Sequence, residues 1–384
     1  MNTVDKMCFL PHLDPVPLAE VLRRWQSDFP KMGVCAFLSE AQKDQLEMLQ
    51  AQCAQQHIPL VGAIFPALIY DGAFHSDGVL LLRFDEMPFY TLQADLPTDA
   101  PGVEQQCDTL TRQIVGQLVP GQSYTLFMLF DAMVPNIGTL LDGLYLQLAN
   151  RVHYAGANAG SETFAPMACL FDGQRLVQNG VLLVLLPSHK GAILEHGYRA
   201  PPHTVYATST SGNRISQIDW RPAFEVYQEL VLAQYGVKVT PQNFYEHAVH
   251  FPFGIVRANH HVVVRIPVVL NEDGSLFCVG EVPANSVLTL LERPVVDSHE
   301  TLRVLTDGLT LMNGDSAGAE LLMFYCAGRR MHLLEARAVA ELQAFGRITQ
   351  AAHIAGAVSL GEIGGSTLHG YPLFHNATII TARW

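Results

Sequence analysis

The sequence predicts an α/β protein of two closely packed domains, each a mixed sheet covered by helices. The chain has 384 residues, which is long for a single average domain. Of these residues 49% are apolar and 15% are charged, so there is enough material for sizeable cores. Segments with helical apolar spacing also alternate with short apolar runs, an order typical of a sheet covered by helices.

The first half of the chain supplies the alternating elements. Helical spacing of apolar residues marks four segments: 18–29, 40–56, 103–119 and 137–150. Strand-like runs between and after them occupy 32–39, 59–69, 78–84, 88–96, 124–134, 152–160, 168–176, 181–187 and 191–199. Asp172-Gly173 and Asn179-Gly180 are typical of hairpin turns. No short internal repeat is evident.

The second half begins with a predicted helix at 221–236, which has Pro222 near its first turn and Gly236 at its end. The further predicted elements are a helix at 241–250, several strands, a helix near 298–312, a strand at 319–326, a helix at 333–345 and a strand at 353–360. We place the domain boundary near 220–240, which gives domains 1–225 and 226–384. The chain has no low-complexity linker there, so we expect the two domains to pack together.

Charge and cysteine content narrow the class of protein. The formal net charge of -13 argues against a nucleic-acid partner, which requires a basic face, and suits a cytoplasmic protein. The first residues lack the pattern of a signal peptide, and the apolar runs are too short to span a membrane. Seven dispersed cysteines without a CxxC pair predict reduced thiols rather than disulfides or a zinc site. The formation of a homodimer stays open.

Several local motifs have a structural interpretation that outweighs the functional one. Residues 155–160, AGANAG, lack the full GxGxxG pattern and are followed by strands, which favours a tight strand connection over a phosphate loop. Cys326 follows a buried strand, where a turn is favoured over a nucleophile. His375 and Asn376 precede the last strand, where turn hydrogen bonds are the default. Because no serine elbow, HExxH, Walker loop or carboxylate pair is present, we expect no enzyme.

A histidine cluster is the most unusual feature of the sequence. Residues 244–265 hold four of the sixteen histidines. His247 and His250 are three apart, so they share one face of the predicted helix, for which Thr240 is the expected N-cap. Imidazoles at a helix C-terminus can simply favour the negative end of its dipole. The alternative is metal ligation. His260 and His261 lie in a strand-like run that sends them to opposite faces, so at most one faces a given pocket.

Among metals, haem iron requires the fewest ligands from this segment. A hard cation needs several carboxylates, and Glu246 is the one nearby; zinc needs further ligands at fixed spacing. Haem iron needs one axial imidazole and an apolar pocket. The aromatic residues that can form the pocket walls here are Phe244, Tyr245, Phe251 and Phe253.

Five segments of the chain, 154–186, 207–231, 250–258, 322–345 and 361–382, resemble the FIST proteins, which pair a FIST N-terminal and a FIST C-terminal domain in cytosolic signal transduction. The resemblance implies a ligand-sensing module rather than an enzyme, with small molecules such as amino acids as ligands. One branch of the family, the NosP-type proteins, binds haem b and senses nitric oxide. Its members act with a sensor histidine kinase, in a two-component system, or with a cyclic-di-GMP enzyme. The chain is similar to this branch.

The resemblance also implies site residues. His247 is additional to the simple aromatic-Pro-Leu-Gly pattern of FIST sequences, whereas His250 lies immediately before it, so His247 is the expected axial haem ligand and His250 the second choice. The predicted function is therefore a cytosolic haem-based nitric oxide sensor that regulates a signalling partner. The alternative is a FIST sensor without haem, in which a small amino-acid-like ligand contacts Arg329, Glu362 and Asn376.

Overall fold

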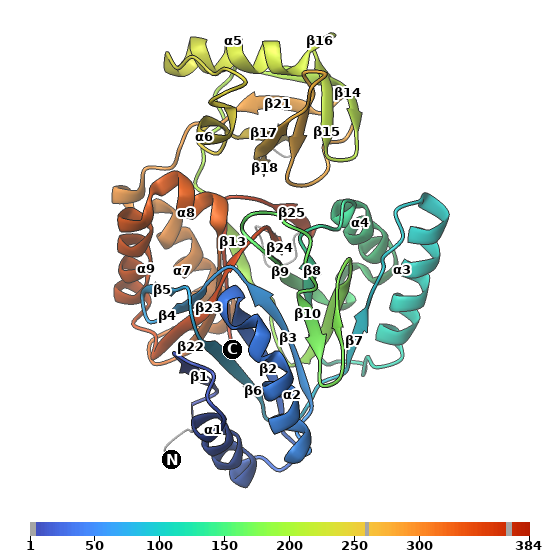
Figure 1. The fold of residues 1–384 in the computed structure, drawn as a ribbon, viewed down its shortest axis with the longest axis vertical. Helices are drawn as coiled ribbons and strands as arrows, with labels where there is room; N and C mark the ends of the chain where they lie inside the picture. The colour runs from blue at the N-terminus through green and yellow to red at the C-terminus, as the bar shows by residue number, and fades with distance from the viewer. Residues whose placement is uncertain (1–4, 258–260, 366–370) are drawn as a thin grey trace.

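The computed structural model describes residues 5–257, 261–365 and 371–384. These residues confirm the predicted α/β fold class, because helices cover three sheets that each contain parallel and antiparallel strand pairs. In the described part of the chain, the body of the molecule consists of three six-stranded sheets, and a separate β-rich domain lies above it (Figure 1). No helix in this part is long and apolar enough to cross a membrane.

The body repeats one arrangement of strands three times within the described residues. Each copy has a parallel strand pair joined through a helical segment: β2 with β3, β8 with β9, and β22 with β23. A hairpin and a last strand follow, and the last strand returns antiparallel to the first strand of the pair. The repeat is long and its copies share few residues, which is why no short repeat is evident in the sequence.

The three copies contain corresponding helices and strands, whose bounds are as follows. Copy one consists of β1 (Met7–Leu10), α1 (Pro15–Asp28), β2 (Gly33–Ser39), η1 (Glu40–Gln45), α2 (Leu46–Gln55), β3 (Leu60–Phe65), β4 (Leu68–Tyr70), β5 (Ala73–His75) and β6 (Val79–Phe84). Copy two consists of β7 (Tyr90–Gln93), α3 (Ala100–Val115), β8 (Tyr124–Asp131), α4 (Ile137–Leu148), η2 (Ala149–Arg151), β9 (His153–Ala159), β10 (Leu170–Asp172), β11 (Leu176–Val177) and β12 (Val181–Pro187). Copy three consists of β13 (Ile193–Glu195), η3 (Val296–Ser298), α7 (Glu300–Asn313), β22 (Glu320–Cys326), α8 (Ala327–Leu333), α9 (Glu335–Thr349), β23 (His353–Ser359), β24 (Glu362–Gly364), β25 (Leu373–His375) and β26 (Ile379–Arg383).

The three copies exchange their hairpins in a cycle. The hairpin β4–β5 of copy one pairs with β23, the hairpin β10–β11 of copy two pairs with β3, and the hairpin β24–β25 of copy three pairs with β9. The predicted run 59–69 is therefore two strands of different sheets, separated at Pro66, which cannot donate a ladder hydrogen bond. Strands on opposite sides of residue 225 therefore pair with each other, as β4 does with β23. The domain ranges 1–225 and 226–384 stay a prediction.

A glycine occupies the same place in the second parallel strand of each copy. A Cβ atom on Gly62, Gly156 or Gly356 would lie 1.7–2.0 Å from a carbonyl oxygen of the neighbouring strand, so only glycine fits there. Gly156 belongs to the AGANAG segment. The interpretation of that segment as a tight strand connection is wrong, because it forms the middle and end of β9 and its glycine allows two strands to approach closely.

Alternation along the central strands produces the cores. One face of each sheet turns toward a shared centre, where the rings of Phe37, Phe65 and Phe324 lie 5.1–5.6 Å apart. The opposite faces pack against helices, as Met128 does in copy two. Each such side chain contributes about 1.5–3 kcal/mol by its burial, so the shared centre ties the three sheets together.

The β-rich domain is inserted in copy three, between β13 and α7. It contains β14 (Val205–Ser211), β15 (Arg214–Ile218), β16 (Arg221–Pro222), α5 (Ala223–Tyr235), α6 (Phe244–Ala248), β17 (Phe253–Val256), β18 (Val262–Arg265), β19 (Pro267–Leu270), β20 (Leu276–Cys278) and β21 (Val287–Leu290). Gly236 ends α5 in the left-handed conformation, as predicted. The helix predicted at 241–250 is shorter, because Thr240 donates its N–H to Oδ1 of Asn243 in a turn that delays the helix start.

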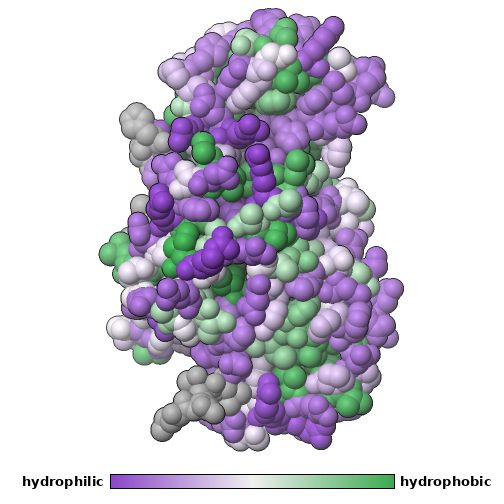
Figure 2. Space-filling model, turned by 90° about the vertical axis from the view of Figure 1, so that its left-hand side faces the viewer, coloured by the Kyte–Doolittle hydropathy of each residue, from purple (hydrophilic) through white to green (hydrophobic). Residues whose placement is uncertain are grey.

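Figure 2 shows the face of the molecule on the side of α9. Hydrophilic residues dominate the inserted domain at the top, whereas hydrophobic residues gather in patches on the body below it.

Candidate functional site

Two insertions break the threefold pattern of the body. Two residues connect β3 to β4 and two connect β23 to β24, whereas the corresponding connection in copy two is the ten-residue segment 160–169. The second insertion is the β-rich domain itself. Both insertions reach the same place, because residues from each line two cavities that adjoin one another.

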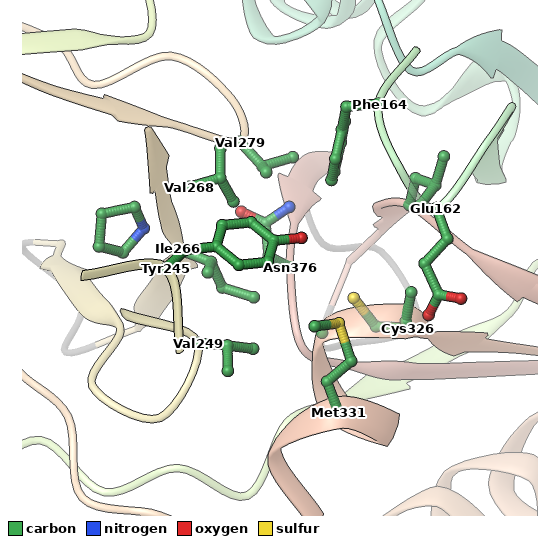
Figure 3. Close-up of a pocket in the computed structure, with 14 residues that line it drawn as sticks. Glu162, Phe164, Tyr245, Val249, Ile266, Val268, Val279, Cys326, Met331 and Asn376 are labelled. Atoms are coloured by element: carbon green, nitrogen blue, oxygen red, sulfur yellow. The ribbon is translucent and has the colours of Figure 1, made fainter. Parts of the chain in front are cut away.

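The larger cavity has a volume of about 250 Å³ and the smaller of about 40 Å³. Four residues line both: Phe164, Tyr245, Val268 and Val279. Figure 3 shows that the side chains around the smaller cavity come from three parts of the chain, namely the segment after β9, the inserted domain with α6, and copy three of the body. The site is therefore assembled between the inserted domain and the body.

Helix α6 supplies one wall of the cavities. Phe244 and Ala248 lie on one side of this short helix and pack into the core of the inserted domain. Tyr245 and Val249, also one turn apart, line the smaller cavity. Tyr245 is 59% exposed, so this wall of the cavities is open to solvent and is not part of a core.

Three side-chain amides line the cavities with at least one buried atom that has no partner among the described residues: the buried Asn158 and Asn376, and the half-buried Asn213, whose Oδ1 is such an atom. Asn158 is 0% exposed and lines the larger cavity, and neither atom of its amide has a hydrogen-bond partner among the described residues. Asn376 lines the smaller cavity; its Nδ2 donates to the carbonyl of His375, while Oδ1 has no partner within the described chain. An unpaired buried polar group costs about 1–3 kcal/mol. These amides are the groups that a polar ligand would satisfy.

The other two copies show what a purely structural residue looks like at position 158. In the paired registers, Asn158 corresponds to Ile64 in copy one and to Val358 in copy three. Both counterparts are buried and apolar. Asn158 was not among the predicted site residues, although an alignment of LVGAIF, YAGANA and IAGAVS on their shared Gly-Ala pair identifies it.

Glu362 is a second buried polar group that replaces an apolar one. Its register positions in the other copies are Leu68 and Leu170. Ser359 and Thr378 donate hydroxyl hydrogen bonds to its carboxyl group. Burial raises the pKa of Glu362 to about 7, against the opposing effect of these hydrogen bonds. The carboxyl group is held by internal partners beside the cavity residue Cys326, which also hydrogen-bonds to it.

Cys326 lines the smaller cavity but has a structural partner. The N–H of Ala377 donates to its Sγ at 3.0 Å, just as the N–H of Asn179 donates to Oδ2 of Asp131 at 2.7 Å in copy two. Burial also raises the pKa of the Cys326 thiol far above its usual value. A thiol that stays protonated is a poor nucleophile. The predicted turn is wrong, because Cys326 is the last residue of β22 and α8 begins at the next residue.

The residues predicted for a haem-free ligand do not act as one set. Asn376 lines a cavity, and Glu362 is bonded internally as described above. Arg329 is fully buried and forms an ion pair with Glu341, with nitrogen–oxygen distances of 2.6 and 2.9 Å. It also donates to the carbonyl of His196. Its guanidinium group thus links α8, α9 and the segment after β13.

The predicted haem-pocket aromatics separate into two groups. Phe244, Phe251 and Phe253 are buried in the core of the inserted domain, where Phe244 and Phe253 contact the ring of Tyr227. Tyr245 instead lines both cavities. The three phenylalanines therefore already have packing partners in the core.

The candidate histidines also lie apart from the cavities. His247 is half-buried, with its ring centre 6.4 Å from that of Phe251. His250 is half-buried, and its ring centre lies 5.1 Å from that of His332. Burial, followed by the charge of His247, lowers the pKa of His250. His261 precedes β18 instead of lying in it, and His260 lies outside the described residues.

This arrangement can be compared with what haem requires. No histidine in the described ranges lines either cavity, and the expected phenylalanine walls fill a core instead. The same ranges contain no group of three or more His, Cys, Asp or Glu side chains placed to hold a metal ion. A cavity of about 150 Å³ is large enough for benzene. Haem, a macrocycle of four pyrrole rings, needs a much larger cavity than benzene does. The expected histidine ligands and phenylalanine walls therefore lie outside these two cavities, and haem binding stays a prediction.

A cavity between an inserted domain and a body, with apolar walls and a few unpaired polar groups, is typical of the class of proteins that bind small molecules. Comparison with protein families agrees with this class. The FIST N domain matches residues 33–221 and the FIST C domain matches residues 223–365, so the chain belongs to the FIST family of signal-transduction sensors. No curated protein matches the chain.

Proposed function

We propose that this chain is a cytoplasmic sensor that binds a small organic molecule between its inserted domain and its body. The observation that carries the proposal is the buried amide of Asn158, which lines a cavity of about 250 Å³ and has no partner among the described residues. Small-molecule sites are typically apolar clefts with a few polar groups that orient the ligand. This site has that composition.

The position of the cavity suggests how binding produces a signal. The inserted domain contacts the body through Glu281, whose carboxylate accepts a hydrogen bond from the N–H of Thr139 at 2.9 Å, in the first turn of α4. A ligand that contacts both sides of the cavity favours the arrangement in which the two parts are closed. The altered surface then acts on a partner, for which the family resemblance implies a sensor histidine kinase or a cyclic-di-GMP enzyme.

A thermal-shift screen with two variants tests the proposed site. A compound that binds the native protein raises its melting temperature. Val268 lines both cavities, and Val268→Trp should fill them and abolish the shift. Val304→Trp, on the exposed side of α7, should leave the shift unchanged. Hits whose shifts survive in Val268→Trp would show that the ligand binds elsewhere.

Haem-based nitric oxide sensing is the second candidate function. The observation in its favour is the pair of imidazoles of His250 and His332, because burial lowers the pKa of both and neutral imidazole is the metal-binding form. Haem titration followed by absorption spectroscopy tests it. A haem spectrum lost in His247→Ala or His250→Ala would support this candidate, whereas a spectrum identical to free haem would eliminate it.

A further inference from the structure

We infer that the ligand is an uncharged molecule of one or two rings that presents an amide-type edge, such as a carboxamide or a lactam, to Asn158. The inference rests on the proposed function and specifies the chemical class of its ligand. It follows from the hydrogen-bonding groups, the charges and the size of the larger cavity.

The hydrogen-bonding groups of the ligand follow from the side-chain amide of Asn158. A primary amide side chain offers a carbonyl acceptor and an NH₂ donor next to each other. In Asn158 both are buried and unpaired within the described residues. A ligand with a neighbouring N–H and C=O can satisfy both through two parallel hydrogen bonds. A ligand with a donor or an acceptor alone would leave one atom of the amide unpaired, which costs about 1–3 kcal/mol.

The charge of the ligand follows from the residues that line the cavities. None of the described residues that line the larger cavity carries a charge. Glu162 lines the smaller cavity, and its carboxylate is paired with the guanidinium of Arg330 at 3.1 Å. Burying an ion without a counter-ion is strongly unfavourable. A neutral ligand therefore fits this cavity better than a carboxylate or an ammonium ion.

Arg265 is a candidate counter-ion beside the larger cavity, and it is already engaged. Its guanidinium is buried next to Gly280, which lines the larger cavity. It donates to the carbonyl oxygens of Glu281, Val264 and Phe374 at 2.9–3.0 Å. Arg265 is not among the residues that line the cavity, so it holds the wall together and does not face the ligand.

The size and shape of the ligand follow from the volume and the walls of the larger cavity. An apolar cavity of about 150 Å³ accommodates benzene, so about 250 Å³ accommodates a substituted ring or two fused rings. Phe164, Tyr245, Phe277 and Phe374 give the larger cavity aromatic walls. Aromatic side chains pack well against planar rings, so a planar ligand fits the cavity.

The equivalent positions provide an internal control for the role of Asn158. Ile64 and Val358 fill the same place in copies one and three with apolar side chains. If Asn158 were structural, replacing it with valine would destabilise the protein. If it is kept for a ligand, Asn158→Val removes an unpaired buried amide and should leave the melting temperature of the ligand-free protein unchanged or raise it.

The experiment compares matched neutral and anionic probes. Nicotinamide, benzamide and uracil are the neutral probes, and nicotinate and benzoate are the anionic counterparts. Isothermal titration and thermal shift should detect at least one neutral probe, with affinity about tenfold or more above that of its carboxylate. Asn158→Val should weaken that probe by about tenfold, the effect expected for a lost hydrogen-bonded amide. Val358→Ala serves as the control that leaves binding unchanged.

Three outcomes would overturn the inference. One is tighter binding of the carboxylates, which would point to Arg265 as an anion partner. Another is equal binding of a neutral probe to the wild type and to Asn158→Val. The third is no binding of any neutral probe. If Val268→Trp abolishes the binding of a charged compound while Asn158→Val does not, the inference fails but the proposed sensor function stands.

Discussion

At the scale of residues, polar side chains replace apolar ones at equivalent positions near the cavity. Asn158 replaces Ile or Val, and Glu362 replaces Leu. Burying such groups lowers stability unless they have partners. Glu362 has internal partners, whereas Asn158 has none among the described residues. Comparison of the copies therefore separates a polar group held by the fold from one that is available to a ligand.

The raised pKa of Glu362 predicts a pH-dependent contribution to stability. Its folded pKa of about 7 lies above the ordinary value of 4.5, so the folded protein holds this proton more tightly than the unfolded chain does. The contribution is therefore fully present below about pH 4.5 and is lost as the pH rises through about 7. The free energy of unfolding of the wild type relative to Glu362→Gln should fall by on the order of 2–3 kcal/mol over this range.

Urea denaturation at pH 5 and pH 8 measures this difference. Glu47→Gln, on the exposed side of α2, is the control and should show no such change. A constant difference between the wild type and Glu362→Gln across the two pH values would contradict the assignment of a buried, proton-holding carboxyl group.

The sequence predicted some site residues and missed others for physical reasons. Asn376 was predicted as a ligand contact, and it does line a cavity. Arg329 was predicted together with it from the family resemblance, but an arginine in a buried ion pair cannot be distinguished from a binding arginine by sequence alone. Asn158 was hidden in a glycine-rich strand, because its significance depends on the registers of three sheets.

At the scale of elements, the ion pair between α8 and α9 should be important for stability. Arg329 and Glu341 are 0% and 1% exposed, so removing one partner leaves a buried charge. Arg329→Met should lower the free energy of unfolding by about 3–5 kcal/mol. Arg221→Met, which breaks an exposed pair with Glu229, should lower it far less, because solvent screens exposed ion pairs.

Chemical denaturation of the two variants provides the comparison. Equal losses in both would mean that Arg329 does not hold the helices together.

Most elements here were predictable, because apolar spacing determines whether a segment is a helix or a strand. The extent of α6 was not, since the turn closed by Asn243 competes with the helix before Phe244.

At the scale of the whole molecule, the exchange of hairpins should make the body a single cooperative unit. Fragments 1–225 and 226–384 each lose pairing partners, such as β23 for β4 and β9 for β24. We expect neither fragment to unfold cooperatively alone. Residues 200–292 contain the core of the inserted domain and should fold by themselves.

Thermal unfolding followed by circular dichroism tests these expectations, with the full chain as reference. A cooperative transition in fragment 1–225 alone would contradict the interlocked arrangement.

The sequence predicted an α/β fold correctly because local patterns report element type. It could not reveal the exchange, since pairing between strands distant in the chain leaves no local pattern.

The most direct test of the central claim is native mass spectrometry of the protein as purified, compared with Val268→Trp. The account predicts that the wild type carries a small neutral organic molecule that denaturation releases, and that Val268→Trp, with its cavity filled, carries none. A bound mass that persists in Val268→Trp would contradict it. So would a bound mass equal to haem that disappears in His247→Ala.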